Sequence, residues 1–118
     1  MSQIWKWNDV ELEIDMQDVD FQEKYERAFE ILEKEEKEVI KIGKLSEMTR
    51  SYCNMFFHLF DNIFGDNTSE KLFNGRINEA LVNDCYDSFL VLCKKDVDEI
   101  NKRRMARASK YKVKNSRK

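Results

Sequence analysis

The chain has 118 residues, a length that suits one domain with a single modest hydrophobic core. Charged residues make up 37% of it and hydrophobic residues 42%, and proline is absent, which predicts a mainly α-helical protein with few sharp loops. No stretch approaches the roughly 20 apolar residues of a membrane-spanning helix, and the N-terminus lacks a signal-peptide pattern. We therefore expect a cytosolic protein.

Charge is distributed unevenly along the chain. Residues 102–118 contain nine basic residues and no acidic ones: Lys102, Arg103, Arg104, Arg107, Lys110, Lys112, Lys114, Arg117 and Lys118. The other 101 residues hold 12 basic and 23 acidic residues, a net charge of −11. This asymmetry predicts a single acidic helical domain over residues 1–101 and a basic, flexible tail over residues 102–118.

Residues 3–15 have the pattern of a β-hairpin whose two-residue turn is Asn8-Asp9. This turn predicts the cross-strand pairs Trp7–Val10, Trp5–Leu12, Gln3–Ile14, Lys6–Glu11 and Ile4–Glu13. The pairing sorts most of the apolar side chains onto one face. A lone two-stranded hairpin is marginally stable in water, so its tryptophan face must pack on the helices or on a partner chain.

The first long helix is expected to begin at Asp18 or Asp20, because acidic residues favour a helix N-terminus. Its apolar stripe consists of Phe21, Tyr25, Ala28, Phe29 and Leu32. From Glu33 to Glu38 the stripe gives way to the charged run EKEEKE. This run fits either a solvated helix face or a helix that extends beyond the body, and we favour the solvated face because such runs are common on helix surfaces.

The stretch from Met55 to Asn78 is the predicted centre of the core, since it contains five of the eight phenylalanines. Apolar residues at helical spacing in its first half are Phe56, Leu59, Phe60, Ile63 and Phe64. Nothing in this stretch has a catalytic pattern. We expect Phe60, Phe64 and Phe73 to be buried.

Two tight corners are predicted within the same stretch, on either side of a one-turn helix. Gly65 interrupts the preceding helix, and Asn67 would cap the short helix with Glu70 as its capping-box partner. Asn74-Gly75 would end the short helix with a left-handed residue. A further long helix then starts at about Asn78. The predicted fold class is thus mainly α, with three long helices, a one-turn helix and an N-terminal β-hairpin.

Two of the predicted helices carry apolar faces that are wider than an ordinary surface helix needs. They lie within residues 46–64 and 78–101. The surplus indicates either a central position in the fold or contact with a protein partner. The candidate partner-binding residues are Trp5, Trp7, Phe57 and Tyr86.

No residue pattern indicates catalysis or a metal site. Cys53, Cys85 and Cys93 are widely spaced within helical apolar patterns, as is typical of buried free thiols in a reducing compartment. His58 is the only histidine, and its distance of five residues from Cys53 does not match the i,i+4 spacing of two ligands on one helix. We therefore predict no catalytic residue, no metal and no cofactor.

The basic tail is a second kind of candidate binding surface. Its cations could hold phosphates through a salt-sensitive attraction that does not depend on base sequence. The candidate nucleic-acid contacts are Arg103, Arg104, Arg107, Lys110 and Lys112. The other interpretations are a solubilising tail and a tail that folds back onto the protein's own acidic helix.

Several motifs, taken in order, resemble a known family. They are Val10-Glu11-Leu12-Glu13-Ile14, Tyr25-Glu26-Arg27-Ala28, Phe57-His58-Leu59-Phe60-Asp61-Asn62-Ile63-Phe64-Gly65, Thr68, Lys71-Leu72-Phe73-Asn74-Gly75, Asn78 and Lys110-Tyr111. This order resembles the small tail assembly chaperones encoded in the tail-gene clusters of siphophages and prophages of Gram-positive bacteria. The sequence departs from that pattern at Asn67 and Asn74, where glycine is expected. Asn is the next most tolerant residue in the left-handed region, so the corners can persist.

The resemblance implies a non-enzymatic helper protein of the host cytoplasm. Its implied partner is a phage structural protein, either the tape measure or the tail-tube protein, held through apolar helix faces. A homo-oligomer is compatible with this role. The alternative, from another class, is a small phage nucleic-acid-binding or regulatory protein that acts through the basic tail.

Overall fold

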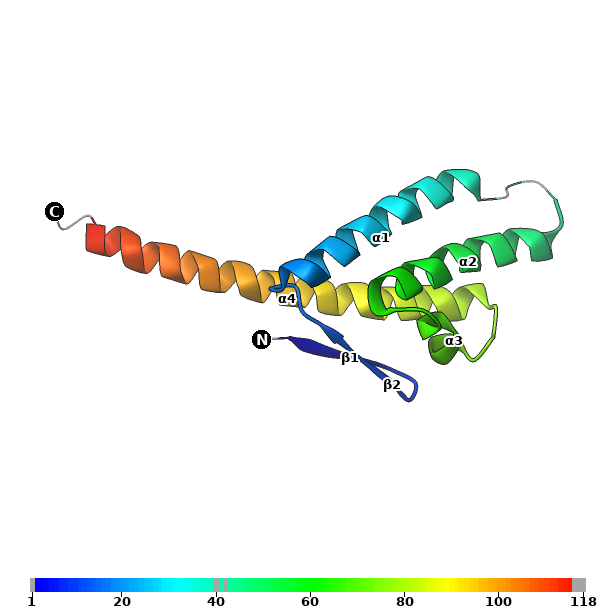
Figure 1. Cartoon of the computed structure of the whole chain (residues 1–118), viewed down its shortest axis with the longest axis horizontal. Coiled ribbons are helices and arrows are strands. Elements are labelled where there is room, and N and C mark those ends of the chain that lie inside the picture. The colour runs from blue at the N-terminus through cyan, green and yellow to red at the C-terminus, as the bar shows by residue number, and fades with distance from the viewer. Residues whose placement is uncertain (1, 40, 42, 116–118) are drawn as a thin grey trace.

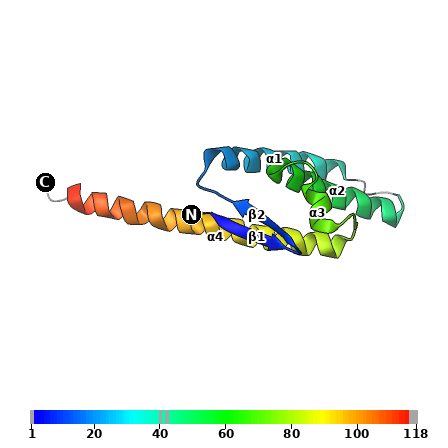
Figure 2. The same ribbon diagram turned by 60° about the horizontal axis from the view of Figure 1, so that its bottom comes forward.

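The computed structural model describes residues 2–39, 41 and 43–115, with side chains described up to residue 111. It confirms a mainly α-helical fold with an N-terminal β-hairpin (Figure 1). In chain order the elements are β1 (Gln3–Trp7), β2 (Val10–Ile14), α1 (Val19–Glu38), α2 (Leu45–Phe64), α3 (Thr68–Phe73) and α4 (Glu79–Asn115). Helices α1 and α2 form an antiparallel pair, α4 runs along them, and the hairpin packs against α4 (Figures 1 and 2).

The β-hairpin has the predicted register. Strands β1 and β2 are antiparallel, with Trp5 opposite Leu12 and Trp7 opposite Val10, and the other three predicted pairs are also present. Asn8 occupies the first turn position with a φ of 53°, a region that Asn enters more readily than most residues. The alternation of side chains and the length of the turn were therefore sufficient to define the pairing.

Trp5 anchors the hairpin to the helices. Its ring centroid lies 5.4 Å from that of Phe60 on α2 and 5.2 Å from that of Phe89 on α4. The indole nitrogen donates a hydrogen bond of 3.1 Å to Ser88 Oγ, so the polar edge of the buried ring is satisfied. The tryptophan face was predicted to pack either on the helices or on a partner chain. In the structure, Trp5 packs on helices of its own chain.

Helix α1 packs along α2 and buries Ala28 and Leu32. The helix follows Asp18, one of the two predicted caps, although the Asp18 side chain makes no capping hydrogen bond. The charged run at the end of α1 lies mainly in solvent, which is the interpretation that we favoured. Within this run, Glu35 turns toward α2 and pairs with His58.

The corner between α2 and α3 differs from the prediction in its cap. Asn67 precedes α3, but its side chain makes no capping hydrogen bond, so the predicted capping box with Glu70 is wrong. Asp61, in the last turn of α2, takes this role: Ser69 donates its N–H to Oδ1 at 2.8 Å and its hydroxyl to Oδ2 at 3.1 Å. The physical reason is the backbone of Asn67, which is left-handed, whereas a capping residue is normally extended.

Left-handed backbone angles occur at both corners, at Asn67 and Asn74. At these two positions the resemblance noted in the sequence leads one to expect glycine. Asn67 has a φ of 70° and Asn74 a φ of 55°. The Asn74 N–H donates to the Glu70 carbonyl at 2.8 Å and thereby ends α3. At the start of α4, Asn78 Oδ1 accepts the Leu81 N–H at 3.0 Å, which agrees with a helix that begins at about Asn78.

The phenylalanine-rich stretch lies at the centre of the core, as predicted. Phe60 and Phe73 are buried, whereas Phe64 is only half-buried. Phe64 is the last residue of α2, and its ring packs at the edge of the core, 6.1 Å from that of Phe21. The aromatic core therefore joins α2 to the hairpin, to α1 and to α4.

Helix α4 extends beyond the predicted domain boundary. The boundary after Asn101 does not coincide with a helix end, because α4 continues without a break to Asn115. Among the described side chains of α4, Ile100 is the last buried one, and every side chain from residue 101 to 111 is exposed. The helix thus projects from the body (Figure 1), and the molecule measures 70 × 31 × 22 Å. The flexibility of the basic segment stays a prediction.

Candidate functional site

Two of the predicted partner-binding residues belong to the hairpin, and one of them is a core residue. Trp5 is only 1% exposed, so it is not available to a partner, contrary to our expectation. The register of the hairpin decides which face carries the tryptophans, but not what covers that face. Trp7 packs at the edge of the core, and its buried indole nitrogen has no hydrogen-bond partner among the described residues.

Tyr86, the third predicted residue, lies half-buried on α4 in a group of aromatic rings. Its ring centroid is 4.6 Å from that of Phe56 on α2 and 6.4 Å from that of Phe29 on α1. Burial raises the pKa of the Tyr86 hydroxyl, and the neighbouring Asp87 adds to this shift. Tyr86 therefore packs the three long helices together and offers a partner only part of its side chain.

Phe57, the fourth predicted residue, lies at a surface hollow. The hollow has a volume of about 200 Å³ and is lined by Phe57, Ser69, Glu70, Phe73, Gly75 and Ile77. We call it the Phe57 hollow. The rings of Phe57 and Phe73 lie 5.1 Å apart and form its apolar wall, and Ile77 is 37% exposed. A hollow of this size and lining suits one large apolar side chain of a partner protein.

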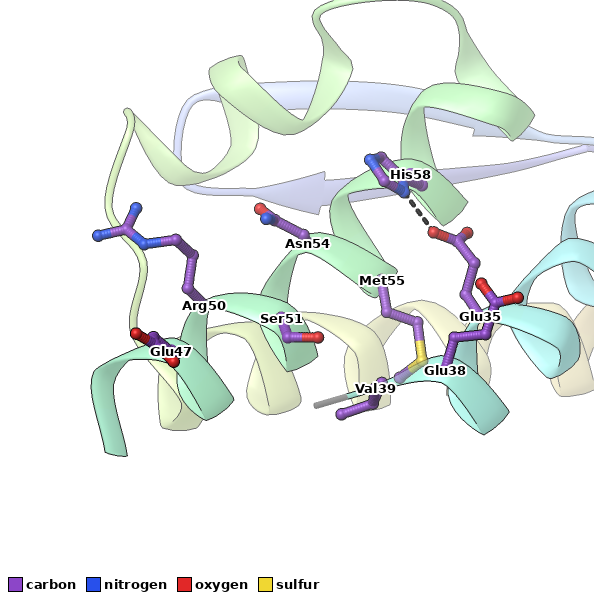
Figure 3. A pocket seen from close by; sticks show the side chains of 9 residues that line it. All are labelled: Glu35, Glu38, Val39, Glu47, Arg50, Ser51, Asn54, Met55 and His58. Atoms are coloured by element: carbon purple, nitrogen blue, oxygen red, sulfur yellow. Dashed lines mark hydrogen bonds and ion pairs between the residues drawn. The ribbon is translucent and has the colours of Figure 1, made fainter. Parts of the chain in front are cut away.

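A larger hollow lies between α1 and α2, near their connection. It has a volume of about 390 Å³ and is lined by Glu35, Glu38, Val39, Glu47, Arg50, Ser51, Asn54, Met55 and His58 (Figure 3). The carboxylate of Glu35 points toward the imidazole and contacts Nδ1 of His58. Because three glutamates and one arginine line this hollow, it would favour a positively charged ligand over a negatively charged one. Sequence spacing could not reveal this pair, because its members are 23 residues apart.

The three cysteines are free thiols inside the core, on the helix faces that the sequence assigned to apolar packing. Burial raises the pKa of Cys53, Cys85 and Cys93, to about 12 for the last two. Because the thiolate is the reactive and metal-binding form, these side chains are weak nucleophiles near neutral pH. Within the described residues, no group of three or more His, Cys, Asp or Glu side chains could hold a metal ion.

Asp96 is a structural carboxylate that sequence reasoning missed. It is 0% exposed on α4, and its Oδ2 accepts the N–H of Met16 at 2.9 Å. Its other oxygen has no hydrogen-bond partner among the described residues. Asp96 thereby holds the β2–α1 connection against α4 close to the point where α4 leaves the body. No sequence signal marks it, because a single aspartate among charged helical residues resembles an exposed one.

The predicted nucleic-acid contacts lie on the projecting part of α4. Arg103, Arg104, Arg107 and Lys110 are exposed, and we call these four the basic ridge. The side chain of Lys112 falls outside the described part of the chain. Steps of four and three residues place Arg103, Arg107 and Lys110 on one face of the helix. Nη2 of Arg103 also lies 3.8 Å from Oε2 of Glu99, one turn earlier in the same helix.

These features define a small, mainly α-helical protein with a core braced by a hairpin and with a projecting basic helix. Among the residues that the structure describes, no helix combines the length and the apolar content needed to cross a membrane. A family model described as a family of unknown function, DUF6673, matches residues 8–118, and the chain belongs to this family. The match includes every element after β1. No curated protein and no solved structure matches the chain.

Proposed function

We propose that this protein is a non-enzymatic assembly helper of a phage tail, which holds the tape measure or tail-tube protein before assembly. The resemblance of its motifs to tail assembly chaperones motivates the proposal. The structural observation that supports it best is the large amount of surface that the chain leaves uncovered.

The chain exposes more surface than a compact monomer of its size. Its radius of gyration is 18.4 Å, compared with about 13.5 Å for a compact chain of this length. Its accessible surface is 8634 Å², compared with about 6,800 Å² for a compact monomer of this mass. The difference is about twice the roughly 800 Å² that each partner buries in a standard protein–protein complex. A shape of this kind supports a function in binding other proteins.

The Phe57 hollow is the surface where a partner helix would dock. Its aromatic wall is already formed by Phe57 and Phe73, so a partner side chain would lose little free energy to rearrangement of this surface. Exposed Ile77 extends the apolar surface from the wall. An amphipathic helix could insert one apolar side chain into the hollow and place its polar face in solvent.

The proposal is tested by calorimetric titration of the purified protein with a siphophage tape measure protein and a siphophage tail-tube protein. We expect one of them to bind, and we expect Phe57→Asp and Ile77→Asp to weaken binding at least about tenfold. Leu45→Asp is the matched control, because Leu45 is an exposed apolar residue at the opposite end of α2. Circular dichroism verifies that each variant is folded. Absence of binding to both proteins, or an equal loss in Leu45→Asp, would contradict the proposal.

The basic ridge favours a second candidate function, the binding of nucleic acid. Its four cations are exposed on one helix and could neutralise phosphates. Fluorescence anisotropy with labelled DNA and RNA over a range of salt concentrations tests this function. Affinity that falls linearly in the logarithm of salt concentration, and that disappears when residues 102–118 are deleted, would support it. Combined with absence of binding to tail proteins, this result would replace the assembly function.

A further inference from the structure

Most of the basic ridge lies on the same side of α4 as the residues that α4 buries against the body. Buried residues of α4 recur at steps of four and three residues: Phe89, Cys93, Asp96 and Ile100. The same series continues, beyond the body, with Arg103, Arg107 and Lys110. The segment from residue 101 to 115 is about 22 Å long. Its body-facing side is therefore a row of cations that no described part of the chain covers.

An acidic surface lies beside the base of this ridge. The hydrogen bond between Met16 and Asp96 holds the β2–α1 connection against α4, and α1 starts directly afterwards. Four exposed acidic residues lie at and just before the start of α1, and we call them the acidic shoulder: Asp18, Asp20, Glu23 and Glu26. Residues 15–27 contain five acidic and two basic residues, so the shoulder is net negative. Glu26 and Arg104 line the same small hollow, which marks the junction of shoulder and ridge.

A positive surface next to a negative one makes this side of the molecule self-complementary. If a second copy is turned end for end about a two-fold axis, each ridge meets the shoulder of the other copy. We propose that two copies of this chain associate antiparallel in this way, with their α4 helices crossing near Asn101. One contact of ridge with shoulder then occurs twice in the dimer.

Apolar contacts accompany the charges in this arrangement. Met105 and Tyr111 are largely exposed on the projecting segment. A groove of about 360 Å³ lies between α1 and α4 and is lined by Tyr25, Leu90, Cys93, Lys94 and Val97. When two α4 helices cross near Asn101, the projecting segment of one copy runs along this groove of the other. The exposed surface in excess of a compact monomer is large enough for such an interface.

The other occupants of the ridge fit less well. Helix α4 is continuous, so the ridge cannot turn back onto its own body. Two ridges side by side would bring like charges together, which is unfavourable. A nucleic acid on the ridge would lie beside the acidic shoulder, which repels phosphates. A second copy, in contrast, neutralises both surfaces.

The proposal is tested by sedimentation equilibrium of the full-length protein at low and high salt. We expect a dimer whose dissociation constant rises at least about tenfold between about 50 mM and about 500 mM salt, because exposed charges are screened. This measurement needs only the purified chain, so its outcome is independent of whether a tail protein binds.

Two charge-reversal variants make the test specific. The ridge variant carries Arg104→Glu and Arg107→Glu, and the shoulder variant carries Glu23→Lys and Glu26→Lys. All four residues are exposed, so both variants should fold. Each variant alone should dissociate at least about tenfold more readily than the wild type, whereas an equimolar mixture should form mixed dimers, because both of its contacts again join opposite charges.

The matched control is Lys34→Glu with Lys37→Glu, which reverses two exposed cations at the other end of α1 and should leave the dimer intact. A wild type that is monomeric at low salt, or a mixture that remains monomeric, would overturn the proposal. Binding of nucleic acid by a monomeric wild type, lost in the ridge variant, would assign the ridge to nucleic acid instead.

Discussion

Individual backbone angles decide which residues the α3 corners accept. Asn67 and Asn74 have φ values of 70° and 55°, in a region where a residue with a Cβ is strained and Asn is less strained than most. Asn and Gly are the two residues most compatible with these angles, so either residue would fit these corners.

Replacement of Asn74 should separate the effect of backbone angle from that of the side chain. Asn74→Ala should lower the free energy of unfolding by about 1 kcal/mol, because alanine has no compensation for the left-handed angle. Asn74→Gly should be nearly neutral. Urea denaturation followed by circular dichroism measures both values. Asn62→Ala, on the exposed face of α2, is the control and should not destabilise. Equal losses for the Ala and Gly variants would contradict this explanation.

The buried thiols make stability dependent on pH above the neutral range. Burial raises the pKa of Cys85 and Cys93 to about 12, whereas unfolded thiols ionise near about 8.5. Between these values the unfolded state binds fewer protons than the folded state. The contribution of these thiols to the free energy of unfolding should therefore be constant below about pH 8 and fall as the pH rises toward 12, which urea denaturation at several pH values between about 8 and 12 measures.

A Cys85→Ala variant tests the origin of this alkaline loss. Its free energy of unfolding should fall less steeply with pH than that of the wild type. Burial also raises the pKa of Tyr25 to about 12, so part of the fall should remain. An unchanged slope in Cys85→Ala would show that the thiol does not contribute.

At the scale of elements, the hairpin depends on one side chain that reaches two helices. Trp5→Ala should lower the free energy of unfolding by about 3–5 kcal/mol, because it leaves a cavity between Phe60 and Phe89. Ile4→Ala, the neighbouring but exposed residue, is the control and should change stability little. Thermal and urea denaturation measure both. A folded Trp5→Ala variant of wild-type stability would mean that the hairpin is not part of the core.

The hairpin shows which structural features local sequence patterns can predict and which they cannot. Alternating residues and a two-residue turn allowed one pairing, and that pairing is present. The same patterns left open whether the helices or a partner would cover Trp5. The outcome depends on the contacts of Trp5 with residues of α2 and α4, which lie far away in the chain. The partner-binding role predicted for Trp5 was therefore a packing role.

At the scale of the whole molecule, the body and the projecting helix should be separable. Truncation after Asn101 should change the free energy of unfolding of the monomer, measured at about 500 mM salt, by no more than about 0.5 kcal/mol, because every described side chain that it removes is exposed. Small-angle scattering should show a smaller radius of gyration than 18.4 Å. Truncation after Lys95 is the contrasting variant, since it also removes buried Asp96 and Ile100, and it should be strongly destabilised. Equal stability of the two truncated proteins would place the boundary elsewhere.

The sequence by itself determined the features that arise from neighbouring residues. These include the hairpin register, the helical phenylalanine stretch and the left-handed helix end at Asn74. The partner-binding role of Phe57 stays a prediction, and the hollow that surrounds this residue was not predicted. Such features follow from side-chain period, turn length and allowed backbone angles, which act over a few residues and can be read along the chain.

Only the tertiary structure decided which distant groups meet. Asp61 caps α3 in place of its neighbour Asn67, and Asp96 holds Met16 against α4 across 80 residues of sequence. The length of α4 that projects from the body also depends on tertiary packing. The sequence shows the cations after Asn101, but their exposure on a continuous helix depends on where the packed body ends. Contacts of this kind depend on distances in space, and spacing along a chain does not record them.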